Sequence, residues 1–233
     1  LSDDGVTDLL VGWRSADAES DTLYLYRFRN GTLSEEFHVS CDGMAIADFN
    51  GDGAEELIAA TLDGGVTLQL IGWGSSGISV LDSAYSSLRM QSLLGSVAGM
   101  IAPQQPGAAF YGRVNADMTA SLLVGVDGNT LLLPQESETI GYSGSYCYSG
   151  AVPADINRDG VVELPWSAVA AVTADSAREE TQYFTEYRTL LGSGYQTVAV
   201  CYQNTADGWQ FILPDVLRDA YSMGLLSLRW RAE

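Results

Sequence analysis

Short runs of hydrophobic residues alternate with glycine- and aspartate-rich turns along nearly the whole chain. The runs recur roughly every 8–12 residues, as strands do in all-β folds. The predicted strands are 8–13, 22–28, 32–39, 56–62, 66–73, 78–85, 108–114, 121–126, 130–134, 162–169, 183–190 and 197–203. Within 22–28 apolar residues occupy both alternating faces, as in a sheet that is packed between two other layers. The pattern therefore predicts an all-β protein.

Acidic and amide side chains recur at one fixed spacing in two loops between strand-like runs. Their oxygens can turn inward toward one hard cation, and calcium takes about 6–8 oxygen ligands. Glycines at Gly53 and Gly160 allow each loop to bend sharply. Three carboxylates in one turn repel each other unless a cation neutralises them. The predicted ligands are Asp48, Asn50, Asp52, the carbonyl of Ala54, and Glu56 in the first loop, and Asp155, Asn157, Asp159, the carbonyl of Val161, and Glu163 in the second.

These loops differ from an EF-hand, in which a glutamate stands at the twelfth position of the loop. Counted from Asp48, that position is Ala59, and the last carboxylate already comes at the ninth residue. The flanking segments also look like strands rather than helices. The order strand, D-x-N-x-D-G-x-x-E-L loop, strand resembles the FG-GAP (VCBS, integrin-α-like) repeat, whose loop joins two adjacent strands of a β-propeller blade.

The loop glycine indicates the period of the chain. Gly53 and Gly160 lie 107 residues apart, which is two periods of about 53 residues. Gly107 lies half-way, in a strand–turn–strand segment where Ala102, Gln104 and Pro106 stand at the positions of the carboxylates. We expect this copy to keep its turn and to lack an ion.

A further partial copy of the loop stands at the beginning of the chain, where Asp4, Gly5 and Asp8 match its last positions. The resemblance thus implies one domain, residues 1–233, built as a β-propeller-like array of four units of four strands. The expected units are 1–43, 44–97, 98–150 and 151–204, followed by a closing segment at 205–233. Such an array leaves only short sheet edges.

The closing segment is expected to contain a short helix over residues 214–224. Pro214 stands at its start, Asp215 lies in its first turn, and Gly224 ends it, which matches the preferences of helix termini. We expect either the following strand-like run, 225–230, or the run 209–213 to pair with the first unit and close the ring.

Composition narrows the possible partners. The formal net charge is −19, with 30 acidic residues against 11 basic ones. Because nucleic acids are bound by neutralising phosphates with Lys and Arg, nucleic acid is not an expected partner. No apolar run reaches the roughly 18 residues of a transmembrane helix. Three cysteines, Cys41, Cys147 and Cys201, are too few for a disulfide framework, so either one pair or three buried thiols is possible.

No catalytic constellation stands out in the sequence. His38 is the only histidine, so it cannot form a zinc site with other histidines, and no G-x-S-x-G motif is present. Paired carboxylates could serve a glycosidase, but none of the 30 acids is singled out. Aromatic residues are dense in one region and fit either packing between sheets or a ligand surface: Tyr142, Tyr146, Tyr148, Trp166, Tyr183, Phe184 and Tyr187.

The sequence therefore predicts a binding or adhesion module without an evident catalytic site, stabilised by two structural calcium ions. The FG-GAP resemblance implies a secreted or cell-surface protein with a protein or glycan partner, and the targeting segment is absent from this chain. Weak calcium loops require about millimolar calcium, which also favours an extracellular setting. The alternative function is the non-catalytic, or else the catalytic, part of a secreted carbohydrate-active enzyme.

Overall fold

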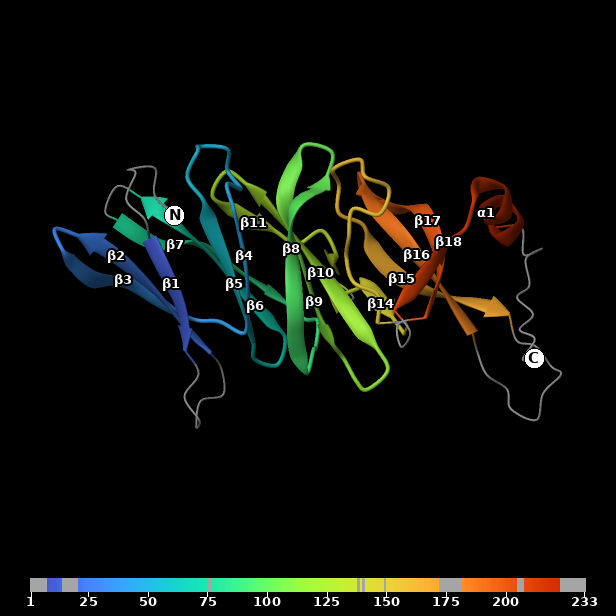
Figure 1. The fold of residues 1–233 in the computed structure, drawn as a ribbon, viewed down its shortest axis with the longest axis horizontal. Coiled ribbons are helices and arrows are strands. Elements are labelled where there is room, and N and C mark those ends of the chain that lie inside the picture. Colours follow the sequence, from blue (N-terminus) through green and yellow to red (C-terminus); the bar gives the residue numbers. More distant parts are fainter. Residues whose placement is uncertain are drawn as a thin grey trace.

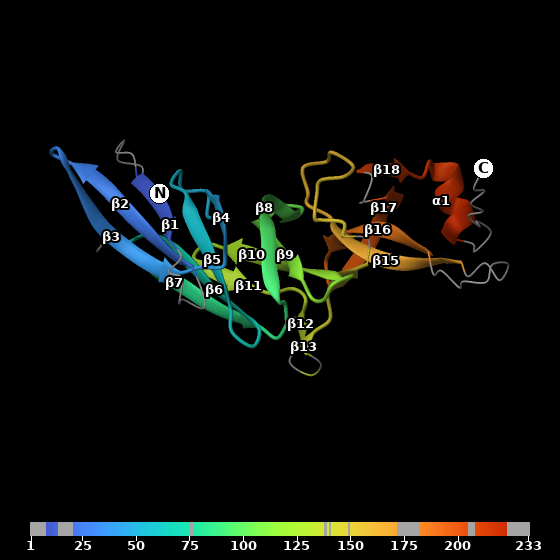
Figure 2. The same ribbon diagram turned by 60° about the horizontal axis from the view of Figure 1, so that its bottom comes forward.

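The computed structural model describes residues 8–13, 21–74, 77–137, 139, 141–148, 150–171, 182–204 and 208–222. It confirms an all-β protein with one short helix in the described part. Four antiparallel sheets follow one another along the chain, and Figures 1 and 2 show them side by side in one row.

Each sheet is a meander, because strands that follow one another in the sequence pair as neighbours. The first sheet contains β1 (Asp8–Trp13), β2 (Thr22–Arg29) and β3 (Thr32–Ser40). The second contains β4 (Gly43–Ala47), β5 (Glu56–Leu62), β6 (Val66–Gly74) and β7 (Gly77–Ser86).

The third and fourth sheets are built in the same way. The third contains β8 (Ser92–Ala102), β9 (Gln105–Arg113), β10 (Thr119–Asp127) and β11 (Thr130–Leu132), with β14 (Ser145–Cys147) paired to β10. The fourth contains β15 (Leu164–Ala171), β16 (Gln182–Leu191), β17 (Gly194–Asn204) and β18 (Trp209–Ile212). A small ribbon of β12 (Glu136–Ser137) and β13 (Gly141–Tyr142) follows the third sheet.

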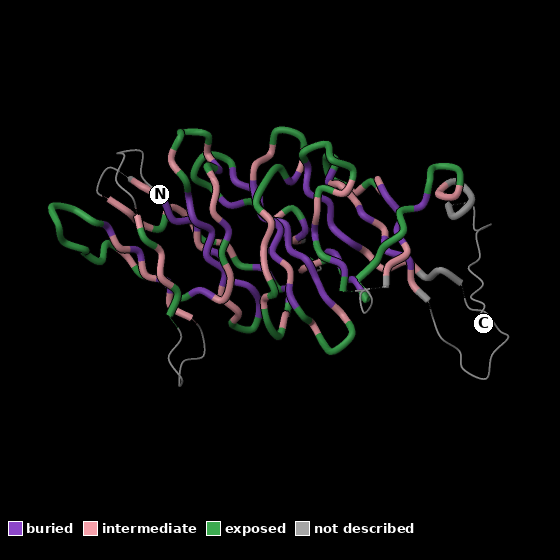
Figure 3. Tube along the Cα trace, in the orientation of Figure 1, coloured by how far each residue is buried: buried purple, intermediate pink, exposed green. Residues whose placement is uncertain are grey.

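The core lies between the sheets, where buried residues of neighbouring strands meet (Figure 3). Strand β5 contributes to the core on both of its faces, because successive side chains of a strand point to opposite faces. Leu57 and Ala59 pack toward the first sheet with Leu23, while Ile58 and Ala60 pack toward the third sheet with Phe110. Strands β5 and β10 of the inner sheets are therefore buried along most of their length, which explains why they are largely apolar.

The fourth sheet carries α1 (Asp215–Ser222) over its outer face. Phe184 and Val200 are buried there beneath Leu213, and Leu217 of α1 packs against them. The helix confirms the sequence prediction, although its expected end at Gly224 lies outside the described residues. Among the described elements, no helix is long and apolar enough to cross a bilayer.

The described sheets form an open row whose first and last members lie at opposite ends (Figure 1). The prediction that 209–213 pairs with the first unit is wrong, because β18 pairs with β17 as the outer strand of its own sheet. The other candidate for closure, 225–230, lies outside the described part of the chain.

The third unit differs from the prediction in its first turn. Strands β8 and β9 are joined directly through residues 103–104, and Gly107 lies inside β9, opposite Gly125. The expected turn at Gly107 is therefore wrong. A Cβ atom at Gly107 would lie 2.1 Å from the carbonyl oxygen of Val124, so the glycine permits close approach of two strands. The expected unit boundary between residues 97 and 98 falls within β8.

Candidate metal loops

The two predicted calcium loops occupy the same place in the second and fourth sheets. Residues 48–55 connect β4 to β5, and Ala47 is the register partner of Glu56. Residues 155–162 precede β15, and Ala154 forms an antiparallel bridge with Glu163. Each loop thus closes a pair of antiparallel segments, and the structure brings each predicted set of side chains together in one loop.

The first loop is folded around its own acidic and amide side chains. Asp48 accepts hydrogen bonds from the backbone N–H of Gly51 (2.8 Å) and of Gly53 (3.1 Å). Asn50 Oδ1 accepts from the backbone N–H of Asp52 (2.9 Å), whose own Oδ1 accepts from Ala54 (2.8 Å). The side chains therefore turn into the loop, as the spacing predicts.

The second loop repeats most of this arrangement, although Asp155 Oδ1 accepts from Asp159 N–H (3.0 Å) where Asp48 Oδ1 accepts from Gly51 N–H. Asp155 Oδ2 accepts from Gly160 N–H (3.0 Å), and Asn157 Oδ1 accepts from Asp159 N–H (2.9 Å). Asp159 Oδ1 in turn accepts from Val161 N–H (2.8 Å). The repeated geometry shows that the shared residue pattern specifies one loop conformation, including the positive φ of the glycine that follows the second aspartate.

A buried glutamate ends each loop. Glu56 Oε2 accepts from Phe49 N–H, and Glu163 Oε2 accepts from Ile156 N–H, each over 2.9 Å. The two residues are only 2% and 0% exposed. Burial raises the pKa of Glu163 to about 7 and also raises the pKa of Glu56. The second oxygen of Glu163, Oε1, is buried without a hydrogen-bond partner, which is costly unless another group or an ion satisfies it.

The residue at the corresponding position differs among the four sheets, and so does the way in which its charge is neutralised. We call this position the entry position. It is the residue at which the chain enters the strand after the loop or turn: Asp8, Glu56, Gln105 and Glu163. Asp8 forms a buried ion pair with Arg27, with Nε 2.8 Å from Oδ1. Gln105 is uncharged and donates from Nε2 to the carbonyl of Val126 (2.7 Å).

Glu56 and Glu163 are acidic, unlike Gln105, and among the described residues neither of them has a basic partner such as Asp8 has. No described Lys, Arg or His side chain forms an ion pair with either of them. The two entry-position glutamates without a cationic partner are those that end the complete Asp–Asn–Asp loops. The residues present therefore fit a bound cation at these two places.

The carboxylates are not gathered around a metal-sized centre in this structure. Within the described residues, no three His, Cys, Asp or Glu side chains lie close enough to hold a metal ion. In the first loop, Asn50 Nδ2 instead lies 3.1 Å from both Asp52 Oδ2 and Glu56 Oε1. In the second, Asn157 Nδ2 lies 2.9 Å from Asp159 Oδ2. Calcium at the ten predicted ligand residues therefore stays a prediction.

Comparison with protein-family models, curated proteins and solved structures finds no match for this chain.

The remaining sequence candidates are distributed over separate places. His38 is exposed and pairs with Glu35 over 2.9 Å, as an ordinary surface residue would. The three cysteines are buried thiols. In the aromatic region, Phe184 and Tyr187 are buried in the core, which agrees with the packing alternative. Tyr148 is 48% exposed and stacks on Tyr183, with ring centroids 4.9 Å apart.

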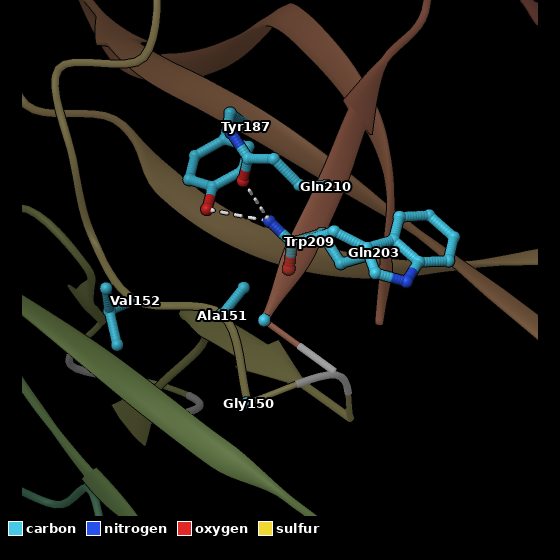
Figure 4. Close-up of a pocket in the computed structure, with 8 residues that line it drawn as sticks. Gly150, Ala151, Val152, Tyr187, Gln203, Trp209 and Gln210 are labelled. Carbon is cyan, nitrogen blue, oxygen red and sulfur yellow. Dashed lines mark hydrogen bonds between the residues drawn. The ribbon is translucent and has the colours of Figure 1, made fainter. Parts of the chain in front are cut away.

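A groove of about 350 Å³ lies beside the fourth sheet (Figure 4). Gln203 Nε2 donates both to the hydroxyl of Tyr187 (3.2 Å) and to Gln210 Oε1 (3.0 Å). None of the lining residues is charged, in a chain of net charge −19. Only Tyr187 was a sequence candidate, because no motif signals the two glutamines. The lining consists of Gly150, Ala151, Val152, Tyr187, Gln203, Gly208, Trp209 and Gln210.

Proposed function

We propose that this protein is a calcium-stabilised binding or adhesion module of the FG-GAP type, built as a β-propeller-like array. One ion is held by Asp48, Asn50, Asp52, the Ala54 carbonyl and Glu56, and a second by the equivalent residues Asp155 to Glu163. The observation that carries the proposal is the contrast at the entry positions. Asp8 is neutralised by Arg27 and Gln105 is uncharged, whereas the buried Glu56 and Glu163 end loops rich in oxygen donors and have no basic partner among the described residues.

The proposed role of calcium is structural. Each loop connects two segments that pair directly beside it, Ala47 with Glu56 and Ala154 with Glu163. An ion held across the loop would therefore stabilise the strand pair, since a site absent from the unfolded chain adds its binding free energy to folding. Side-chain oxygens that already accept loop N–H groups retain lone pairs for a cation.

The setting proposed for such a module is extracellular or at the cell surface, where calcium is abundant enough to fill weak loops. Catalysis is not part of the proposal, since the only histidine, His38, is an exposed residue paired with Glu35. A glycan is favoured over a protein as the ligand, because the uncharged groove at Tyr187, Gln203 and Gln210 offers amide and hydroxyl groups to a neutral polar molecule.

The calcium part is tested by isothermal titration of calcium into chelator-treated protein. We expect about two equivalents to bind, and a rise in Tm when calcium is added, because saturation at 100-fold over Kd stabilises by about 2.7 kcal/mol. Asp48→Ala and Asp155→Ala should each remove one equivalent. Asp63→Ala, an exposed aspartate in the turn between β5 and β6, is the matched control and should retain both. Absence of calcium uptake by the unaltered protein rejects the proposal.

The ligand part is tested on a glycan array, with calcium and with chelator. Binding that is weakened by Gln210→Ala and retained in Gln196→Ala would support a glycan at the groove. Equal binding by both variants would place any glycan elsewhere, and an array without signal would favour a protein partner.

A further inference from the structure

The first metal loop is contacted by a neighbouring sheet. The turn between β10 and β11 belongs to the third sheet, and its Asn129 Oδ1 lies 3.4 Å from Asn50 Nδ2 in the loop of the second sheet. The same hairpin is attached to β7, where Leu131 N–H donates to Asp82 Oδ2 over 2.7 Å. The positive φ of Gly128, 57°, forms the turn that places Asn129 at the tip. The turn at Gly128 and the hydrogen bond of Leu131 to Asp82 therefore hold Asn129 beside the loop.

Three oxygens, two from the loop itself and one from the third sheet, surround one amide nitrogen in this loop. Asn50 Nδ2 lies 3.1 Å from Asp52 Oδ2, 3.1 Å from Glu56 Oε1 and 3.4 Å from Asn129 Oδ1. A nitrogen surrounded by acceptor oxygens marks the point where positive charge is favoured. The side-chain amide of Asn50 also carries an oxygen, which would face the same point if the amide group turned over.

The second loop lacks this third contributor. Asn157 Nδ2 donates to Asp159 Oδ2 over 2.9 Å, and the buried Oε1 of Glu163 remains without a partner. The two loops have the same residue types at their predicted ligand positions, so a difference in ligands between them must come from the neighbouring sheet. The second loop meets the third sheet through Val162, whose N–H donates to the carbonyl of Met100 over 2.8 Å and which lies in one buried cluster with Ile101. Among the described residues, only the first loop has an acidic or amide side chain that is hydrogen-bonded to a side chain of another sheet.

We infer that Asn129 supplies a further oxygen ligand to the calcium ion of the loop 48–56, and that this ion joins the second sheet to the third. The inference rests on the proposed function. The ion in the loop 155–163 is then bound within the fourth sheet alone. Calcium would consequently connect two sheets at one site and two segments of a single sheet at the other.

The test isolates one loop at a time by calcium titration of chelator-treated protein. In an Asp155→Ala background, which leaves the first loop intact, Asn129→Ala should weaken calcium binding by at least roughly 10-fold, since losing even a group that only supports a metal ligand has an effect of this size. Asn129→Asp should strengthen it, because an added carboxylate raises calcium affinity. In an Asp48→Ala background, which leaves the second loop, both substitutions should have no effect. Asn115→Ala, in another turn of the third sheet, should have no effect in either background.

A second measurement tests directly whether calcium joins the second sheet to the third. Calcium should slow amide hydrogen exchange in residues 127–131 of the unaltered protein, and this protection should be lost in Asn129→Ala while the loop 48–56 still gains some. An unchanged calcium affinity of the first loop in both Asn129→Ala and Asn129→Asp, in protein that binds calcium there, overturns the inference and leaves the proposed function standing. Failure of the unaltered protein to bind any calcium rejects the proposed function, and the inference falls with it.

Discussion

Arg27 donates from Nε to Asp8 Oδ1 over 2.8 Å, and the two side chains are 1% and 3% exposed. A second hydrogen bond, from Arg27 Nη2 to Asp8 Oδ2, measures 3.2 Å. The guanidinium group also lies over the ring of Trp73, 4.1 Å from its centroid. Asp8 and Arg27 belong to the first sheet and Trp73 to the second, so this arrangement joins the two sheets and neutralises the entry position of the first.

Arg27→Leu should therefore destabilise the protein by about 3–5 kcal/mol, because it leaves the Asp8 carboxylate buried without its cation. Chemical denaturation measures the change. Arg29→Leu, at the exposed end of the same strand, should change stability by less than about 0.5 kcal/mol. The double variant Asp8→Leu/Arg27→Leu should recover part of the loss, since an apolar pair no longer contains a buried charge. Equal stability of Arg27→Leu and Arg29→Leu would contradict this reading of the ion pair.

Gly107→Ala should destabilise the third sheet, because the new Cβ atom would lie 2.1 Å from the Val124 carbonyl oxygen. Strands β9 and β10 must separate to admit it, and overpacking of this kind costs about 1–3 kcal/mol. Gly12→Ala, at a site with no atom within 4 Å of the added Cβ, is the control and should be neutral. Urea melts of the two variants provide the comparison, and a stable Gly107→Ala protein would show that β9 can shift.

Tyr142→Phe should cost about 1–3 kcal/mol, because it removes a donor from a buried polar network. The Tyr142 hydroxyl donates to the carbonyl of Ser121 and accepts from Gln135 Nε2 (3.3 Å). Tyr85→Phe removes a hydroxyl from a residue that is 57% exposed and should be neutral. Thermal melts distinguish the two variants. An equal, small effect of both would instead leave the aromatic region available as a ligand surface.

The buried thiols should react slowly in the folded protein. Burial raises the pKa of Cys41 and of Cys201 to about 11 in each case, and the thiolate is the reactive form. At pH 8 both should react with a thiol reagent on the order of 100-fold more slowly than in denaturant, where the pKa returns to about 8.5. The raised pKa also means that the stability these thiols contribute is lost as the pH rises from about 8.5, the pKa in the unfolded chain, to about 11, the pKa in the folded protein. Rapid labelling of native protein at pH 8 would contradict their burial.

The strands were predictable where the hydrophobic pattern is strong. The runs 8–13 and 56–62 coincide with β1 and β5. Asn30 and Gly31, both with positive φ, form the turn between β2 and β3, and Asn-Gly is a preferred pair for such a hairpin turn. Strand β8 was missed, because Ser92–Ala102 contains Gly95, Ser96 and Gly99 and shows no regular alternation. Its strand conformation depends on pairing with β9, a contact that the local sequence does not display.

The two metal loops were likewise predictable only in part from the sequence. Their spacing predicted two equivalent sets of inward-facing side chains, because ligand order within nine residues is a local property, and the repeated hydrogen bonds agree with it. The spacing did not indicate how each entry position is neutralised. That Asp8 pairs with Arg27 depends on the register of β1 with β2.

By itself, the sequence determined the all-β class, most strands, the short helix after Pro214 and the shape of the loop around Asp48 and Asp155. Each of these follows from residues a few positions apart, which obey the period of a strand or the reach of one turn. Only the tertiary structure decided that the sheets form an open row, that β18 stays within the fourth sheet, and that Asn129 reaches a loop 79 residues away in sequence. Those features depend on which faces pack together, and that is set by the burial of apolar surface between distant segments, which no local pattern encodes.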